Sequence, residues 1–122
     1  MKILVCGDRE WTDRAAILAV LRDLTHPGDI VIHGACRGVD LLAKSCSIEL
    51  GLVERGYPAK WTAYGLAAGP IRNQEMLDKE QPDLVVAFHP DLTKSKGTKD
   101  MILRAKEASV PIRWFRRKGL DQ

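Results

Sequence analysis

Short apolar runs that alternate with stretches of helical periodicity constrain the fold of this chain most strongly. The clearest run is Leu84–Phe88, which contains no polar residue. In a strand, such a run indicates burial on both faces, as in the middle of a parallel sheet. Three more runs predict strands at Ile3–Cys6, Ile30–Ile32 and Ile112–Phe115, and the more polar stretch Leu52–Tyr57 suits a sheet edge. The pattern predicts an α/β fold in three layers, with a doubly wound, parallel, five-stranded sheet between helices.

Apolar residues repeat with helical spacing between the predicted strands. The two clearest stripes consist of Ile17, Val20, Leu21 and Leu24, and of Val39, Leu42, Ala43, Cys46 and Leu50. Either Thr12 or Asp13 can cap the first of these helices, and Gly51 is a natural end for the second.

The later helices are marked by their first residues. Pro58 to Gly69 is expected to be irregular. Pro70 then suits the first position of a helix that runs to about Lys79, because the missing N–H of proline costs nothing there. Gly97 and Thr98 open the helix that follows the apolar run Leu84–Phe88, and Thr98 can cap it.

The length and composition are those of one globular domain. The chain has 122 residues, of which 45% are hydrophobic and 29% are charged. No apolar run approaches the roughly 20 residues that cross a bilayer, so we expect no membrane span. Met1–Gly7 holds a short apolar stretch that stops at a turn, which indicates a first strand rather than a signal peptide. We therefore expect a cytoplasmic protein.

The cysteines, the histidines and the net charge limit the kinds of disulfide, metal and ligand site that the chain can form. Cys6, Cys36 and Cys46 are an odd number without CxxC spacing, which argues against a disulfide framework and a zinc ribbon. His33 and His89 form no metal-ligand spacing, and ordinary hydrogen-bonded histidines are expected. No metal and no cofactor are predicted. The net charge of +3 is too mild to demand nucleic acid, although it suits an anionic ligand.

Four loops follow predicted strands and therefore meet at one edge of the sheet. They are Gly7–Arg9, Gly34–Gly38, Pro58–Gly69 and His89–Thr98. In doubly wound sheets, ligands bind beyond the carboxyl ends of the strands, where the strand order reverses. The sequence therefore predicts the functional site at this edge.

The segment from Gly34 to Asp40 joins a strand to a helix and is rich in small residues. Its candidate ligand-binding residues are Gly34, Ala35, Cys36, Arg37, Gly38 and Asp40. Small residues let the backbone approach a ligand, and free N–H groups at a helix start favour an anion. The alternative is a tight turn that needs glycine for its backbone alone. Asp40 either stabilises the helix dipole or meets a ligand hydroxyl or acts in catalysis.

The first loop contains Gly7, Asp8 and Arg9. Gly7 can admit a ligand, and the planar guanidinium of Arg9 can bind a phosphate. Equally, Arg9 can be exposed or paired with a neighbouring carboxylate. Trp11 is expected to cover the first helix rather than to stack on a base.

Gly69, Arg72 and Asn73 lie at the start of the helix that follows the irregular segment. A positive charge in the first turn opposes the helix dipole, which favours an anion-binding role for Arg72. The alternative is an arginine that is simply exposed to solvent. Trp61, just upstream, can stack on a planar base or pack at the rim of the site.

Ser95, Gly97 and Thr98 open the helix after the central strand. Gly97 permits close approach to a ligand, and Thr98 can bind a phosphate oxygen as well as cap the helix. Asp100 follows in the first turn, where the helix dipole alone can explain a carboxylate.

Five motifs taken in order resemble the YspA-type (cpYpsA-related) family. They are Gly7-Asp8-Arg9 with Trp11 and Asp13; His33 to Asp40; Tyr57 to Trp61; Ala68 to Asn73 with Met76; and Ser95 to Thr98 with Met101. The resemblance runs from about residue 3 to residue 115. The family belongs to the SLOG superfamily, which includes DprA/Smf proteins and the Lonely Guy phosphoribohydrolases, and is widespread in bacteria and phages. The resemblance implies a Rossmann-like fold that binds nucleotides or nucleotide-derived ligands.

The enzymes among these relatives cleave the N-glycosidic bond of a nucleoside 5′-monophosphate. Their arginine is matched by Arg72, but Met101 stands where they have a catalytic glutamate, and the Pro-Gly-Gly before it is absent. Glycosidic cleavage needs a carboxylate, for which Asp40 and Asp100 are the candidates. The resemblance thus implies binding more directly than hydrolysis.

Three hypotheses follow for the function. The first is that residues 1–122 form a SLOG-type nucleotide-binding domain, a sensor, sponge or processor of a nucleotide-derived small molecule. The second is a phosphoribohydrolase or related N-glycosidase that uses Arg72 with Asp40 or Asp100. The third is single-stranded DNA binding of the DprA kind through Trp114 and the basic end Arg113–Lys118, for which a net charge of +3 is thin support. A homo-oligomer, a dimer or higher, is also expected.

Overall fold

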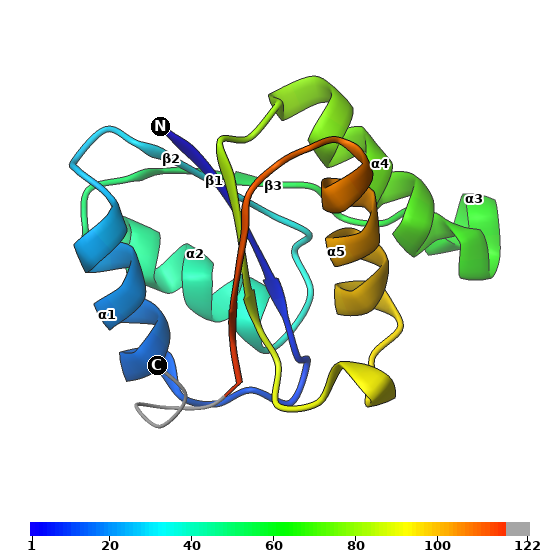
Figure 1. Ribbon diagram of the computed structural model, residues 1–122, viewed down its shortest axis with the longest axis horizontal. Helices are drawn as coiled ribbons and strands as arrows, with labels where there is room; N and C mark the ends of the chain where they lie inside the picture. The colour runs from blue at the N-terminus through cyan, green and yellow to red at the C-terminus, as the bar shows by residue number, and fades with distance from the viewer. Residues whose placement is uncertain (117–122) are drawn as a thin grey trace.

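A computed structural model describes residues 1–116, which form one α/β domain (Figure 1). The elements follow in the order β1 (Lys2–Gly7), α1 (Arg14–Leu24), β2 (Ile30–His33), α2 (Val39–Glu49), β3 (Val53–Gly56), α3 (Trp61–Tyr64), η1 (Gly65–Ala67), α4 (Ala68–Glu80), β4 (Leu84–Phe88), η2 (Leu92–Lys94), α5 (Gly97–Glu107) and β5 (Ile112–Phe115). Here η1 and η2 are short 3₁₀ helices. The strand and helix order agrees with the pattern expected from the sequence.

The sheet is parallel throughout and has the strand order β3-β2-β1-β4-β5. Helices α1 and α2 cover one face, and α4 and α5 cover the other (Figure 1). This arrangement confirms the three-layer, doubly wound, Rossmann-like fold. The strand order reverses between β1 and β4, so the crevice beyond their carboxyl ends is where such a fold binds ligands.

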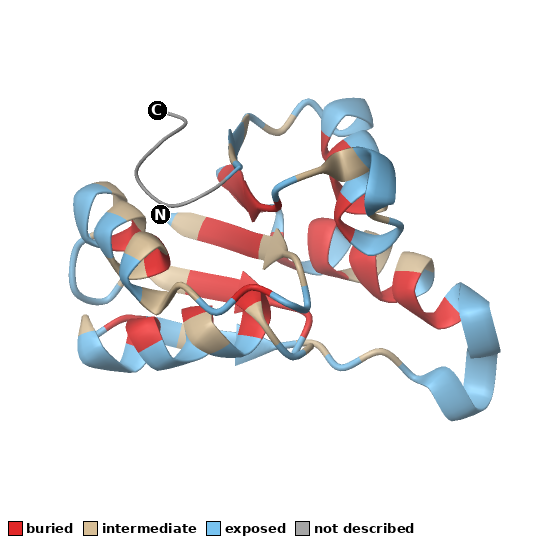
Figure 2. Cartoon of the chain, turned by 90° about the horizontal axis from the view of Figure 1, so that it is seen from below, coloured by how far each residue is buried: buried red, intermediate tan, exposed pale blue. Residues whose placement is uncertain are grey.

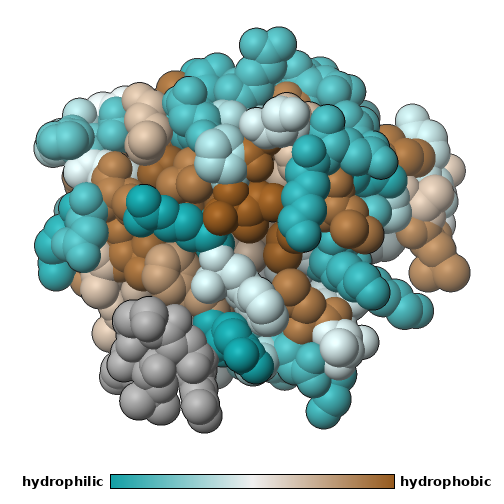
Figure 3. Space-filling view, in the orientation of Figure 1, coloured by the Kyte–Doolittle hydropathy of each residue, from teal (hydrophilic) through white to brown (hydrophobic). Residues whose placement is uncertain are grey.

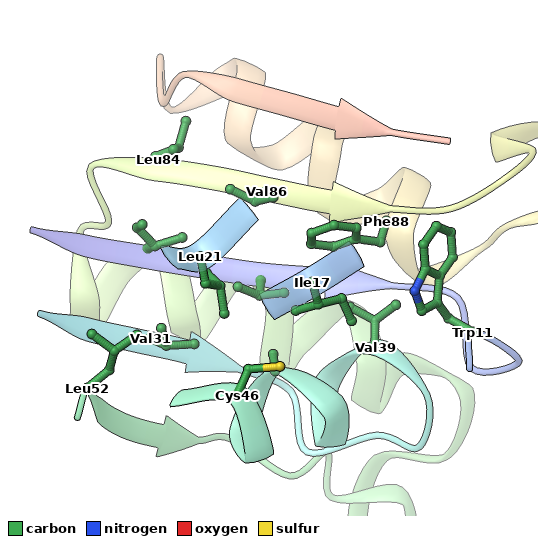
Figure 4. Close-up of a cluster of buried hydrophobic side chains, with 13 residues drawn as sticks. Trp11, Ile17, Leu21, Val31, Val39, Cys46, Leu52, Leu84, Val86 and Phe88 are labelled. Carbon is green, nitrogen blue, oxygen red and sulfur yellow. The ribbon is translucent and has the colours of Figure 1, made fainter. Parts of the chain in front are cut away.

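The larger core cluster lies between the sheet and the α1–α2 layer (Figure 4). Phe88, at the end of β4, is fully buried there. Its ring meets the edge of Trp11 at 5.7 Å and stacks on Phe115 at 5.4 Å, measured between ring centroids. The core therefore extends to the carboxyl ends of β1, β4 and β5 and gives the loops beyond them a rigid base.

The segment between β3 and β4 differs from the expectation. Pro58 to Gly69 was expected to be irregular, but α3 and η1 form within it, and α4 begins at Ala68. Pro70 is therefore the third residue of α4 rather than the first. A helix tolerates proline there because the first four N–H groups have no partner within the helix.

The α3–η1 segment projects from the body of the domain. Every residue from 61 to 67 is exposed, and Figure 2 shows this segment at one end of the molecule. Hydrophobic atoms reach the surface over α3 at the right of Figure 3. The segment is thus positioned by its two ends and not by a core of its own.

Of the helix caps considered in the sequence, one forms at α1 and the other does not form at α5. Asp13 caps α1, because its side chain accepts a hydrogen bond from the backbone N of Ala16. At α5, the expected cap Thr98 lies inside the helix, and the hydroxyl of Ser95 accepts from the backbone N of Thr98 at 3.1 Å instead. The side chain of Thr98 is therefore not used as the cap.

A buried carboxylate ties the end of α4 to the sheet. Glu80 is 3% exposed, and its Oε1 accepts from Arg55 Nη1 at 2.7 Å while its Oε2 accepts from Tyr57 Oη at 2.7 Å. Lys2 Nζ lies 3.4 Å from Oε1. Burial alone would raise the pKa of Glu80, but Tyr57 and the cations Arg55 and Lys2 outweigh it and hold the pKa below its ordinary value of 4.5. The same contact raises the pKa of Tyr57 to about 12.

We expect Glu80→Gln to lower the free energy of unfolding by roughly 2 kcal/mol at pH 7. Because the folded pKa is lowered, the contribution is complete above pH 4.5 and is lost as the pH falls through the lowered value. Urea unfolding at pH 7 and at successively lower pH measures both effects. On the same helix, Glu75 pairs with the exposed Lys79, so Glu75→Gln should cost less than about 0.5 kcal/mol. Equal losses in the two variants would contradict this assignment.

None of the helices within residues 1–116 is both long enough and apolar enough to cross a membrane.

Candidate functional site

A cavity of about 750 Å³ opens at the carboxyl edge of the sheet. This volume lies within the range of small-molecule sites. It is lined by Gly7, Asp8, Arg9, Glu10, Arg37, Trp61, Leu66, Gly69, Pro70, Arg72, His89, Lys94, Ser95, Lys96, Gly97, Thr98 and Asp100. Its walls thus come from the loops after β1 and β4, from the loop before α2, and from the α3–α4 segment.

The structure brings most of the candidate residues to this cavity. Those that line it are Gly7, Asp8, Arg9, Arg37, Trp61, Gly69, Arg72, Ser95, Gly97, Thr98 and Asp100. Those that do not are Gly34, Ala35, Cys36, Gly38, Asp40 and Asn73. Several residues of the second group hydrogen-bond to one another or to residues that line the cavity, as described below.

Arg72 connects three parts of the site. The residue is buried, with 8% of its surface exposed. Nη1 donates to the carbonyl oxygens of Gly34 at 2.5 Å and Tyr57 at 3.1 Å, and Nε donates to Asn73 Oδ1 at 3.0 Å. Nη2 has no hydrogen-bond partner among residues 1–116. The side chain therefore holds the carbonyl oxygen of the glycine loop, and the residue also lines the cavity.

Asp40 supports the same loop from behind. Its Oδ2 accepts from the backbone N of Gly34 at 3.1 Å and of Cys36 at 3.2 Å. Burial raises the pKa of Asp40, although these hydrogen bonds and the nearby Arg72 oppose that effect. The side chain is buried and does not line the cavity, so its visible role is to shape the turn.

Gly7, Gly34 and Gly38 are packed so closely that none of them has room for a side chain without a shift of its neighbours. A Cβ added to Gly7 would lie 2.3 Å from the carbonyl oxygen of Phe88 and 2.5 Å from Cγ2 of Val39. Gly38 has a φ of +77°, and a Cβ there would meet the carbonyl oxygen of Asp8. By contrast, nothing lies within 4 Å of a Cβ added to Gly97. Gly97 is thus the open glycine of the site, and α5 begins at it.

Asn73 joins α4 to the start of α5. Its Nδ2 donates to Asp100 Oδ2 at 3.0 Å and to the carbonyl oxygen of Gly97 at 3.3 Å. The same Asp100 oxygen accepts from Arg104 Nε at 2.9 Å. Asn73 therefore links the two helices through hydrogen bonds. Asp100 lines the cavity, and its Oδ2 already accepts from two donors.

Positive charge dominates the cavity wall. Arg37 is paired with Glu10 at 2.6 Å, and both side chains are exposed. Arg9 lies with its Cζ 5.8 Å from the centroid of the Trp61 ring, a cation–π distance. Neither Arg9 nor Lys94 nor Lys96 forms a salt bridge within the part of the chain that the structure describes. A site with several uncompensated cations attracts anions.

Sequence reasoning missed six lining residues. They are Glu10, Leu66, Pro70, His89, Lys94 and Lys96. The two lysines and His89 lie in the loop after β4, which the sequence places at the functional edge of the sheet. Their position in that loop could therefore have identified them. Leu66, which is 94% exposed, follows from no pattern in the sequence.

His33 and His89 are both hydrogen-bonded through their rings. His33 Nδ1 accepts from the backbone N of Ala35 at 2.9 Å, and its Nε2 lies 2.5 Å from Glu54 Oε1. His89 Nδ1 accepts from the backbone N of Asp91 at 3.0 Å. Within residues 1–116, no three histidine, cysteine, aspartate or glutamate side chains are grouped so that they could hold a metal ion.

The residues considered for DNA binding do not line the cavity within the described part of the chain. Trp114 donates from Nε1 to the carbonyl oxygen of His89 at 2.8 Å, and Cζ of Arg116 lies 5.2 Å from the centroid of the Trp114 ring. One ring face is thus already occupied by an arginine. Arg117 and Lys118 lie outside the described residues.

Comparisons with known proteins give two matches. The sequence model of the family described as "YspA, cpYpsA-related SLOG family" matches residues 1–64. The Gene 61 protein of Mycobacterium phage D29 is 31% identical over an alignment 121 residues long, and the match covers 91% of this chain and 93% of the phage protein. The family match includes β1, β2 and the loops that follow them, and the phage protein extends the similarity across the α4 and α5 walls of the cavity.

Proposed function

The chain belongs to the YspA, cpYpsA-related SLOG family, and from this premise we propose that its cavity binds a nucleotide or a nucleotide-derived small molecule. Membership of the family suggests nucleotide-related binding in general. In this proposal residues 1–122 form a single nucleotide-binding domain that acts as a sensor, sponge or processor of its ligand.

The observation that carries the proposal is Arg72, a mostly buried arginine that lines the cavity. Its Nη2 has no hydrogen-bond partner among residues 1–116 and is reachable by solvent, so it is available to donate to an acceptor atom of a ligand. A phosphate supplies such acceptors and matches the planar donor fork of arginine. Of all groups in the cavity, Arg72 therefore points most directly to an anionic ligand.

The start of α5 supports a phosphate in the same cavity. The hydroxyl of Thr98, a residue that is 5% exposed, has no partner among residues 1–116, and the open Gly97 lets a ligand approach the backbone. The N-terminus of a helix favours negative charge. Lys94 and Lys96 add two cations beside it. A base can then pack beside the exposed ring of Trp61, over which Arg9 already lies.

We expect the double variant Lys94→Ala, Lys96→Ala to bind nucleotides at least tenfold more weakly, with a reduced dependence of affinity on salt. The measurement is calorimetric titration with AMP, ADP, ATP, NAD and ADP-ribose at two salt concentrations. The matched control is Lys44→Ala, Lys106→Ala, which removes the same charge from exposed positions outside the cavity. A wild-type protein that binds no member of this panel would reject the proposed function.

Hydrolysis of a nucleotide N-glycosidic bond is the second candidate, and Asp100 favours it because it is a carboxylate in the cavity wall. One of its oxygens is held by Asn73 and Arg104, so the other is the atom available for acid–base work. Chromatographic release of free base from AMP tests this candidate. Turnover that persists in Asp100→Asn would remove Asp100 from the mechanism.

A further inference from the structure

His89 occupies the floor of the cavity at the point where the strand order reverses. It directly follows β4, and its backbone N donates to the carbonyl oxygen of Phe115 at 3.0 Å. Its own carbonyl oxygen accepts from Trp114 Nε1 at 2.8 Å. On the other side, Asp8 N donates to the carbonyl oxygen of Phe88 at 2.9 Å. The backbone of His89 is therefore held between the ends of β1 and β5, and the residue is 7% exposed.

The hydrogen bond at Nδ1 determines which nitrogen of the ring carries the proton. Because the backbone N–H of Asp91 donates to Nδ1 at 3.0 Å, Nδ1 acts as an acceptor. In a neutral imidazole the other nitrogen, Nε2, then carries the hydrogen and is a donor. The loop after β4 thus presents one specific tautomer of His89.

The Nε2–H group has no partner among residues 1–116. None of the side-chain nitrogens or oxygens sealed from solvent in this range lacks a hydrogen bond, so Nε2 is reachable by solvent. The solvent-filled space that His89 lines is the cavity. His89 therefore presents an N–H donor of fixed tautomer, held by a rigid backbone, at a mostly buried position. Such a donor is well placed to hydrogen-bond to an acceptor atom of a ligand.

We propose that His89 Nε2–H donates a hydrogen bond to an oxygen of the ribose-phosphate part of the bound nucleotide. The proposal rests on the proposed function, since it names a recognition residue of the same cavity. His89 differs from Arg72, Lys94 and Lys96 in that it is a directional donor that carries no charge in this tautomer. It therefore selects the position of one ligand oxygen, whereas the cations attract any anion.

Two substitutions at His89 distinguish the role of Nδ1 from that of Nε2. In His89→Asn the amide oxygen can replace Nδ1 and accept from Asp91 N–H, but no donor reaches the position of Nε2. In His89→Gln the amide Nε2 can replace the ring Nε2, but the contact with Asp91 is lost. We expect the dissociation constant for the tightest nucleotide of the panel to rise about tenfold in His89→Asn and less than about threefold in His89→Gln.

The melting temperatures of the wild type and of both His89 variants, measured without nucleotide, test whether His89 has only a structural role. A histidine that only holds the loop would make His89→Gln the worse variant in both melting temperature and affinity, which would overturn the proposal. Equal affinity of wild type and His89→Asn would overturn it too, while leaving nucleotide binding intact. No binding by the wild type would reject the proposed function and this inference together.

Titration of His89→Asn with adenosine as well as AMP identifies the acceptor oxygen. A loss of affinity confined to AMP identifies a phosphate oxygen, and a loss of affinity for both ligands identifies a ribose oxygen.

Discussion

Gly7→Ala is expected to lower the free energy of unfolding by about 3 kcal/mol, the size of a severe overpacking effect. The new Cβ would lie 2.3 Å from the carbonyl oxygen of Phe88, on the neighbouring strand, and 2.5 Å from the side chain of Val39. Neither neighbour can move freely. The Phe88 oxygen accepts from Asp8 N at 2.9 Å, and Val39 is fully buried in the core. Urea unfolding followed by circular dichroism measures the loss.

Gly97→Ala is the matched control for Gly7→Ala. No atom lies within 4 Å of the added Cβ, and Gly97 is the first residue of α5, where alanine is a better helix former. Its stability should equal or slightly exceed that of wild type, while its nucleotide affinity should fall because the methyl group narrows the cavity. A Gly97→Ala protein as unstable as Gly7→Ala would contradict the division between packing glycines and the open glycine.

Arg72→Met is expected to weaken nucleotide binding at least a hundredfold, the largest binding effect of any single substitution. It removes the donors at Nη2, and it also leaves the carbonyl oxygens of Gly34 and Tyr57 without their donor. Unsatisfied buried acceptors cost about 1–3 kcal/mol, so stability should fall as well. Calorimetric titration and urea unfolding measure the two losses separately.

Arg22→Met controls for the loss of one arginine, because Arg22 is an exposed side chain whose nearest carboxylate, Glu49, lies 4.0 Å away. We expect wild-type affinity and a change in stability below about 0.5 kcal/mol for this control. Arg72→Lys should keep part of the affinity, since a lysine retains the charge and loses the planar fork. An Arg72→Met protein that folds and binds as tightly as wild type would show that the ligand lies elsewhere.

The sequence predicts the fold well because its apolar runs are local signals. Leu84–Phe88 is apolar throughout and is buried throughout in β4, and the polar stretch around Glu54 lies in the edge strand β3. The same topology rule places the site edge, since it depends only on which loops follow strands. Membership of the family supports the same fold independently.

Roles that depend on tertiary hydrogen bonds could not be predicted in this way. Asp40 lies in the first turn of α2, where sequence alone allows a dipole or a ligand role, but its carboxylate binds the N–H groups of its own turn. That geometry depends on Ala35, which has a φ of +57°, and no sequence rule requires this of alanine. Similarly, the tautomer of His89 depends on where the loop places the N–H of Asp91.

The expected homo-oligomer and the cytoplasmic location stay predictions. The α3–η1 segment exposes the large apolar side chains of Trp61, Tyr64 and Leu66. Light scattering coupled to gel filtration across a range of protein concentrations measures the oligomeric state directly.

The most direct test of the account is a titration of ¹⁵N-labelled protein with the tightest nucleotide of the panel, followed by backbone amide shifts. The account predicts that the largest shifts cluster at Arg9, Ser95, Gly97 and Thr98, with smaller ones at Gly34 through its contact with Arg72. Shifts centred on Trp114 and Arg116, or at the amino ends of the strands, would contradict the assignment of the ligand to this cavity.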